Sequence, residues 1–202
     1  MLDFTYEDEA KEKGYKFVCG IDEAGRGPLM GPVCAAAVIL PPHFEIEGLN
    51  DSKKLTEKKR EALFPIITSS AVAYGIAFAT EKEIDELNIL NATMLAMNRA
   101  IKALSTKADF ALIDGNCNRS IEIPSKTIVG GDAKCPSVAA ASILAKVSRD
   151  RLCYELDEKY PEYGFAKHKG YGTKEHMEAI RKYGPCPCHR RTFLKFLDKN
   201  DE

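Results

Sequence analysis

The sequence predicts an α/β protein with a mixed five-stranded sheet, flanked by helices, and a small helical extension at its C-terminal end. Two observations lead to this fold class. Short apolar segments bounded by polar turns recur five times, and the last two are each reached through a helical segment. The first three form a meander that can pair antiparallel, whereas strands reached through a helical crossover run parallel to a neighbour. We therefore expect antiparallel pairing early in the chain and parallel pairing later.

The expected strands lie at 16–21, 32–40, 71–79, 110–113 and 126–129. Each is a short apolar segment, and the third alternates small and apolar residues. Pro41 and Pro42 end the second strand, because proline cannot donate to a strand ladder.

The expected helices lie at 3–13, from 56, from 80, and at 89–104, 136–160, 173–184 and 191–197. Thr56 and Thr173 have the residue type and position of N-caps, and Thr80 with Glu83 matches a capping box. We expect Pro65 to end or bend the helix that contains it. The charged helix at 3–13 is expected to fray.

Chain length and composition indicate one domain with a sizeable core, since the chain has 202 residues of which 45% are hydrophobic. We expect residues 1–160 to form the core, with 1–14 frayed, and residues 161–202 to form a helical extension of the same domain. The net charge of −1 does not by itself indicate a nucleic-acid partner. Between residues 167 and 195, however, eight Lys or Arg face only two acidic residues, which can give the extension a positive face.

Seven scattered cysteines, with no C-x-x-C pair and no secretory signal, favour free thiols in a reducing cytoplasm. Cys186 and Cys188 flank Pro187 and are followed by His189. This spacing is shorter than that of zinc-site patterns, and no second pair lies nearby in the sequence. We therefore expect a proline-rich turn there rather than a zinc site.

Carboxylates follow three separate apolar segments: Asp22 and Glu23 after the first, Asp114 after the fourth and Asp132 after the fifth. Because the carboxyl ends of parallel strands meet at one edge of a sheet, these four acids are expected to converge. Each Asp taken alone could simply cap a turn. Four acids in one pocket repel one another, and divalent cations resolve that repulsion, so we expect a metal site with Mg²⁺ or Mn²⁺.

The same acids lie in motifs that resemble those of ribonuclease HII, the type 2 ribonuclease H. Residues 20–28 read Gly-Ile-Asp-Glu-Ala-Gly-Arg-Gly-Pro, and the resemblance covers about residues 15–195. The further matching segments, in order, are 51–55, 114–116, 131–132, 137–147, 149–150, 169–173 and 189–191. The resemblance implies a ribonuclease H-like fold with catalytic core 1–160 and a substrate-binding extension 161–202. It also implies endonucleolytic cleavage of RNA in RNA–DNA hybrids and 5′ of ribonucleotides embedded in duplex DNA, which leaves 3′-hydroxyl and 5′-phosphate ends.

The resemblance assigns roles to particular residues. The metal-binding acids fall on Asp22, Glu23, Asp114 and Asp132. The Gly-Arg-Gly element that inspects the 2′-hydroxyl falls on Gly25, Arg26 and Gly27, and the substrate-stacking tyrosine falls on Tyr171. Candidate phosphate contacts are Lys53, Lys146, Lys167, Lys169, Arg190 and Arg191. We expect Arg149 and Asp150 to pair with each other structurally, and Ser52 and Asn116 to hold loops in place.

The expected mechanism is two-metal-ion phosphodiester hydrolysis, with Asp22 as the bridging ligand. Three alternatives differ in testable ways. A DNA-specific nuclease of the same fold would cut all-DNA duplexes, and a non-catalytic nucleic-acid-binding protein would not need all four acids. A nucleotide phosphotransferase is disfavoured because no G-x-x-x-x-G-K-[ST] loop is present. We expect a monomer that acts in ribonucleotide excision repair and DNA replication, with no membrane partner.

Overall fold

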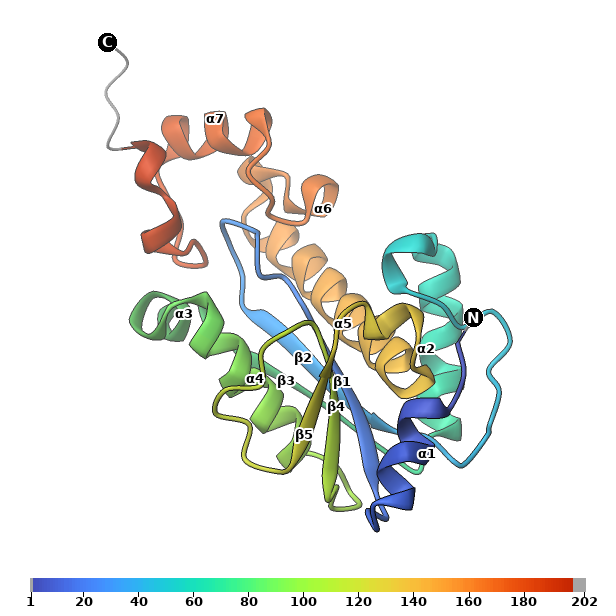
Figure 1. The fold of residues 1–202 in the computed structure, drawn as a ribbon. Coiled ribbons are helices and arrows are strands. Elements are labelled where there is room, and N and C mark those ends of the chain that lie inside the picture. The colour runs from blue at the N-terminus through green and yellow to red at the C-terminus, as the bar shows by residue number, and fades with distance from the viewer. Residues whose placement is uncertain (1, 198–202) are drawn as a thin grey trace.

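A computed structural model describes residues 2–197 (Figure 1). One sheet lies at its centre, with the strand order β3-β2-β1-β4-β5. The strands are Val18–Ala24 (β1), Val33–Ile39 (β2), Ala73–Ala79 (β3), Phe110–Asp114 (β4) and Ser125–Ile128 (β5). β2 pairs antiparallel with β1 and β3, whereas β4 pairs parallel with β1 and β5. The predicted mixed five-stranded sheet and its pairing directions are confirmed. The helical segment expected before the last strand is not formed, because residues 115–124 between β4 and β5 contain no helix.

β2 shows how the sheet is covered on both faces. All seven of its residues are buried, and successive side chains point to opposite faces of the sheet. Val33, Ala35 and Ala37 join the core on one face, and Cys34 and Ala36 join the core on the other. Small residues on both faces let helices approach the sheet closely.

Helices α3 (Glu81–Leu87) and α4 (Ile89–Lys102) lie on one side of the sheet. Helices α1 (Thr5–Glu12), α2 (Glu57–Ser70) and α5 (Pro136–Lys159) lie on the other side (Figure 1). The predicted capping box of Thr80 and Glu83 opens α3. Gly20 shows how closely α5 packs on the sheet, because a Cβ atom there would lie 2.2 Å from the backbone carbon of Ser137.

Three local expectations differ from the structure. α1 does not fray: the Glu7 side chain is buried and accepts hydrogen bonds from the backbone N–H and hydroxyl of Ser137. α2 continues through Pro65, which lies on its exposed side, so the carbonyl group that loses its intrahelical donor is near solvent. The expected last helix consists of two 3₁₀ turns, η4 (Arg191–Phe193) and η5 (Lys195–Leu197).

The C-terminal part lies beyond the end of the sheet, at the top of Figure 1. It contains the 3₁₀ turn η3 (Pro161–Tyr163) and helices α6 (Phe165–His168) and α7 (Lys174–Tyr183). Its own apolar cluster includes Phe165, Ile180 and Leu194, and Met30 from the β1–β2 loop packs into that cluster. This contact fixes the C-terminal part against the loop that follows Asp22 and Glu23. Residues 198–202 of the predicted extension, and residue 1 of the expected frayed segment, lie outside the described residues.

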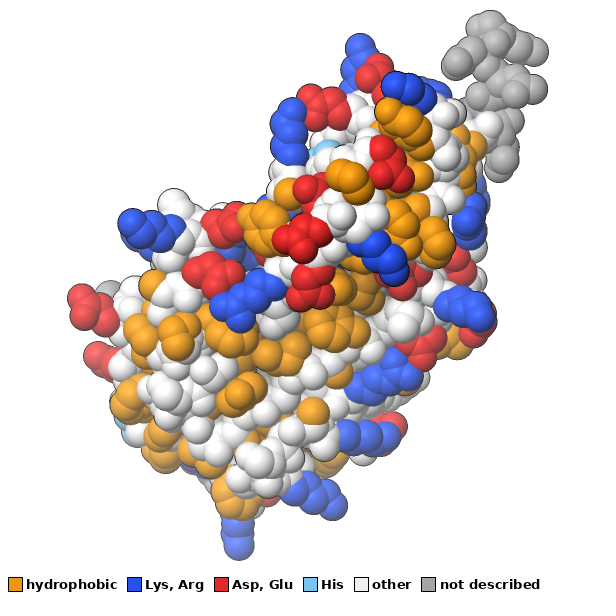
Figure 2. Space-filling view, turned by 180° about the vertical axis from the view of Figure 1, so that it is seen from behind, with side chains coloured by type: hydrophobic (Ala, Val, Ile, Leu, Met, Phe, Trp, Pro, Cys, Tyr) orange, Lys and Arg blue, Asp and Glu red, His pale blue; other side chains and the backbone are white. Residues whose placement is uncertain are grey.

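The surface seen from behind offers no extended region of positive charge. Figure 2 shows Asp and Glu side chains interspersed with Lys and Arg over the upper part of this face. No helix within residues 2–197 is long and apolar enough to cross a membrane.

Candidate active site

The four predicted acids come from three elements at one edge of the sheet. Asp114 is the last residue of β4, and Asp132 lies in the 3₁₀ turn η2 (Gly131–Ala133). Asp22 and Glu23 lie within β1 rather than after it, opposite Ala36 and Ala35 of β2. Because β1 and β4 run parallel, their carboxyl ends reach the same edge.

Three of the acids form a compact cluster. One carboxylate oxygen each from Asp22, Asp114 and Asp132 lies within 4.8 Å of the others. Glu23 is outside this group, although it lines the same cleft as Asp22. Its Oε1 lies 3.2 Å from an Nη atom of Arg26 instead. Backbone N–H groups orient two of the clustered carboxylates: Glu23 donates to Asp22 and Gly131 donates to Asp114, both at 2.7 Å.

Electrostatic repulsion within this cluster changes the acidity of its members. Burial raises the pKa of Asp22 well above its ordinary value, and the charges of Glu23 and Asp114 add to that rise. Burial also raises the pKa of Glu23, against the opposing charge of Arg26. The pKa of Asp132 is raised by burial and by Asp114. These carboxyl groups repel one another when all are ionised. A divalent metal ion would compensate their negative charge, and carboxylate oxygens are suitable ligands for it.

A cleft of about 210 Å³ joins the acids to the predicted substrate-binding residues. Its lining includes Asp22, Glu23, Asp114, Gly25, Arg26, Gly27, Lys53, Lys146 and Tyr171. Asp132 is adjacent, since its Oδ2 lies 3.6 Å from Nζ of Lys53. Tyr171 is 49% exposed, and a Cβ atom on Gly27 would lie 3.4 Å from its ring. The structure therefore gathers residues that are up to 149 positions apart in the sequence, from Asp22 to Tyr171.

The structure does not bring the other predicted phosphate contacts to the cleft as free cations. Nζ of Lys169 is 2.9 Å from the Tyr154 hydroxyl and lies over its ring. Lys167 forms an ion pair with Glu175 at 2.7 Å. The guanidinium of Arg191 donates to the carbonyl oxygen of Pro185 at 3.4 Å. Lys146 lines the cleft but is bound to Asp150 at 2.6 Å.

Arg190 has a different position from the one we predicted. Its side chain is fully buried, and its guanidinium donates to the carbonyl oxygens of Gly25, Arg26, Pro28 and Gly31 at 2.6–3.0 Å. It is thus directed at the backbone of the turn after β1, not at solvent where a phosphate would lie. Arg190 holds the carbonyl groups of that turn toward the protein interior.

Arg149 supports the same turn and was not predicted to do so. It does not pair with Asp150, which instead contacts Lys146 and Arg60. The buried Arg149 guanidinium donates to the carbonyl oxygens of Met30 and Lys169. A sequence signal existed, because Ala145, Arg149 and Cys153 recur at four-residue spacing and therefore share one helix face. The other two members of that face are apolar.

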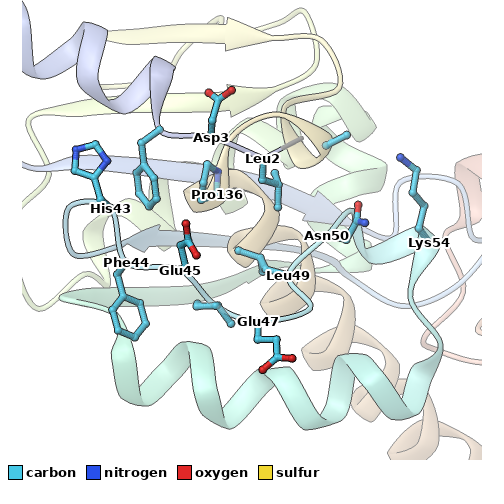
Figure 3. Close-up of a pocket in the computed structure, with 13 residues that line it drawn as sticks. Leu2, Asp3, His43, Phe44, Glu45, Glu47, Leu49, Asn50, Lys54 and Pro136 are labelled. Atoms are coloured by element: carbon cyan, nitrogen blue, oxygen red, sulfur yellow. The ribbon is translucent and has the colours of Figure 1, made fainter.

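A larger hollow of about 1000 Å³ lies elsewhere. It is lined by the 43–50 loop, the N-terminal residues 2–4 and the start of α5. Figure 3 shows that its polar side chains do not converge: His43 lies at one end, and Asn50 and Lys54 lie at the other. The smaller acidic cleft is therefore the better candidate for chemistry.

Comparison with known proteins agrees with this site and fold. Residues 19–196 match the family model of ribonuclease HII. The chain is 60% identical over 190 residues to the ribonuclease HII of Acetivibrio thermocellus, which covers 94% of this chain and 74% of that protein. The ribonuclease H2 of Pyrococcus horikoshii superimposes with a TM-score of 0.73 and 31% identity, over 92% of this chain and 100% of that one. A Bst ribonuclease HIII solved with Mn²⁺ superimposes with a TM-score of 0.67 over 90% of this chain and 69% of that one, and at 20% identity it shows the fold alone.

The mixed sheet with its flanking helices therefore defines an α/β protein of the ribonuclease H-like class. Within that class, the chain belongs to the ribonuclease HII family. As a member of this family it is a ribonuclease H, an endonuclease that acts on nucleic acid.

Proposed function

We propose that the protein hydrolyses the RNA strand of RNA–DNA hybrids and cuts 5′ of single ribonucleotides embedded in duplex DNA. Asp22, Glu23, Asp114 and Asp132 would hold Mg²⁺ or Mn²⁺. Two such ions, when bound, supply activation of water and neutralisation of the leaving 3′-oxygen. The mutual proximity of three carboxylates supports this assignment, because hard divalent cations prefer oxygen ligands.

The observation that carries the substrate proposal is the hydrogen bonding of the Gly25-Arg26-Gly27 turn. The guanidinium of Arg190 donates hydrogen bonds to the carbonyl oxygens of Gly25 and Arg26. Within residues 2–197, the backbone N–H groups of Arg26 and Gly27 donate to no protein acceptor. The turn can therefore present N–H donors to a ribose 2′-hydroxyl beside the acids, which is the group that distinguishes RNA from DNA.

Other residues of the cleft contribute to binding. The exposed Tyr171 ring beside Gly27 can stack on a sugar or base at the RNA–DNA junction. Lys53, with a side chain 77% exposed, can contact a phosphate next to Asp132. Within the predicted substrate-binding extension 161–202, we propose a substrate-binding role for Tyr171 and its loop alone. A monomer in the cytoplasm remains a prediction.

The decisive experiment is cleavage of a DNA duplex that contains one ribonucleotide, with Mg²⁺, with Mn²⁺ and with chelator. We expect one cut on the 5′ side of the ribonucleotide, which is abolished by chelator. The matched control is the same duplex with deoxyribose at that position, which we expect to stay intact. Cutting of the all-DNA control would instead indicate a DNA-specific nuclease of the same fold. Binding without cutting under all metal conditions would indicate a non-catalytic binding protein.

A further inference from the structure

A second set of metal-type ligands lies in the C-terminal part, away from the carboxylates. One ligand atom each from Cys186, Cys188 and His189 lies within 4.8 Å of the others, and all three residues are buried. The Cys186 sulfur is 3.0 Å from the Cys188 sulfur and 3.1 Å from Nδ1 of His189. Thiolate and imidazole are the ligands that zinc and similar soft cations select, whereas the acidic cleft offers only oxygen.

The sequence spacing alone disfavoured such a site, and the backbone explains why this reasoning failed. The chain turns back within four residues, since the backbone N–H of His189 donates to the carbonyl oxygen of Cys186 at 3.1 Å. This turn brings the imidazole over the thiol of Cys186 without a second ligand pair elsewhere in the sequence.

Neighbouring hydrogen bonds fix the form of His189 that binds a metal. Nδ1 of His176 lies 2.9 Å from the carbonyl oxygen of Tyr171, which can only accept, so this nitrogen carries the proton. Nε2 of His176 must then accept from Nε2 of His189, at 3.0 Å. His189 is left with an unprotonated Nδ1, which lies 3.1 Å from the Cys186 sulfur. This nitrogen accepts a hydrogen bond from the backbone N–H of Cys186 at 3.0 Å, and a bound ion would take the place of that donor. A ligating histidine held by a hydrogen bond to its other nitrogen is the usual arrangement in metal sites.

The backbone that carries these ligands is fixed before any ion arrives. The Cys188 carbonyl oxygen accepts from Gly31, and His189 forms a bridge with Met30. Two sulfur atoms on one tetrahedral zinc ion would lie about 3.7 Å apart, given Zn–S bonds of about 2.3 Å. The observed 3.0 Å needs only a small outward rotation of the thiols. A Cys186–Cys188 disulfide would instead need the sulfurs to approach to about 2 Å.

We propose that Cys186, Cys188 and His189 bind a thiophilic divalent cation of the zinc type, with water in the remaining position. Both thiols lose their protons when the ion binds, and no redox step is involved. The ion would tie down the segment that immediately precedes Arg190.

The test uses the full, reduced chain and two probes. After zinc loading and desalting, elemental analysis is expected to find one zinc retained per chain, and Cys186→Ser or Cys188→Ser should abolish this retention. Loading with Co²⁺ should give a thiolate-to-cobalt charge-transfer band that is lost in the same variants. Cys117→Ser is the matched thiol control, and Asp114→Asn controls for binding at the carboxylates. Both control variants should keep the band.

A second measurement covers the case in which the cysteine variants fail to fold. In the unaltered protein, zinc should slow alkylation of Cys186 and Cys188 specifically, and a chelator should restore the rate. Absence of both retained zinc and protection would overturn the proposal. A mass lower by two hydrogens under reducing conditions, with the two cysteines crosslinked in one peptide, would also overturn it in favour of a disulfide.

Discussion

A Cβ atom on Gly25 would lie 1.9 Å from Nε of Arg149, inside the buried contact that supports the turn after β1. Gly25 also has φ +95°, a backbone conformation that residues with a side chain rarely adopt. Gly27, two residues later, has neither constraint and has space for a methyl group beside Tyr171. Position 25 therefore requires glycine, whereas position 27 can accept a small side chain.

We predict that Gly25→Ala lowers the free energy of unfolding by about 2–4 kcal/mol, from backbone strain and overpacking together. Gly27→Ala is the matched control and should cost less than about 1 kcal/mol, while its methyl group reduces cleavage of the ribonucleotide substrate. Urea unfolding of both variants measures the difference. Equal stabilities would contradict the role of Arg149 as a support of the turn.

Arg190 and Lys53 should respond differently to loss of charge. Arg190→Gln leaves buried carbonyl groups without a donor, so it should lower stability by about 3 kcal/mol or more and leave the salt dependence of substrate binding unchanged. Lys53→Gln should leave stability unchanged. It should make the slope of log binding constant against log salt concentration shallower by about 1, as expected for the loss of one phosphate contact. Titrations of a fluorescent duplex without metal, at several salt concentrations and below the melting temperature, measure both slopes. A shallower salt dependence of binding for Arg190→Gln would instead indicate that Arg190 contacts a phosphate.

Asp114→Asn should keep the fold, because the amide oxygen can still accept from Gly131. It should lower the cleavage rate by about 10²-fold or more, since a ligand charge for the metal is lost. Asp8→Asn, half-buried on α1 where it lies 3.6 Å from His43, is the matched control and should cut normally. Turnover of Asp114→Asn at the rate of the unaltered protein would reject the carboxylate metal site.

Metal binding should also be visible in stability, without any substrate. In chelator, Asp22→Asn is expected to be more stable than the unaltered protein by about 1–2 kcal/mol, because one of several repelling carboxylates is removed. Saturating Mg²⁺, at about 100 times its Kd, should stabilise the unaltered protein by about 2.7 kcal/mol and the variant by much less. Thermal or urea unfolding in both buffers gives the comparison. Equal stabilisation of the two proteins by Mg²⁺ would exclude Asp22 as a ligand.

The Glu83–Arg99 ion pair predicts a pH dependence outside the active site. The hydrogen bond from Arg99, whose Nη2 lies 2.6 Å from Oε1 of Glu83, lowers the pKa of Glu83 to about 2. A lowered pKa means that the charged form contributes stability above pH 4.5, and this contribution is lost as the pH falls toward 2. Glu83→Gln should therefore cost about 1 kcal/mol at neutral pH, allowing for solvent screening, and nothing near pH 2. Glu86→Gln, exposed on the same helix, is the control. A difference that persists at pH 2 would show that charge is not the cause.

The sheet and the positions of the acids follow from local patterns, because apolar segments and their ends are visible in short windows of sequence. Asp114 and Asp132 could be placed at one edge from strand direction alone. Arg190 could not be placed correctly, because its partners lie 159–165 residues away and its charge suggests solvent exposure. The meeting of Cys186 with His189 was missed for the opposite reason, since it depends on the geometry of a single tight turn.

The dependence of the turn after β1 on Arg190 has a consequence for synthesis of the protein. All five strands have been translated once residue 128 has left the ribosome, and the last clustered acid follows at residue 132. The guanidinium that holds the turn is translated 58 residues after Asp132. The turn that contains Gly25, Arg26 and Gly27 can therefore take its final form only after residue 190 has been synthesised, long after the carboxylates that lie beside it.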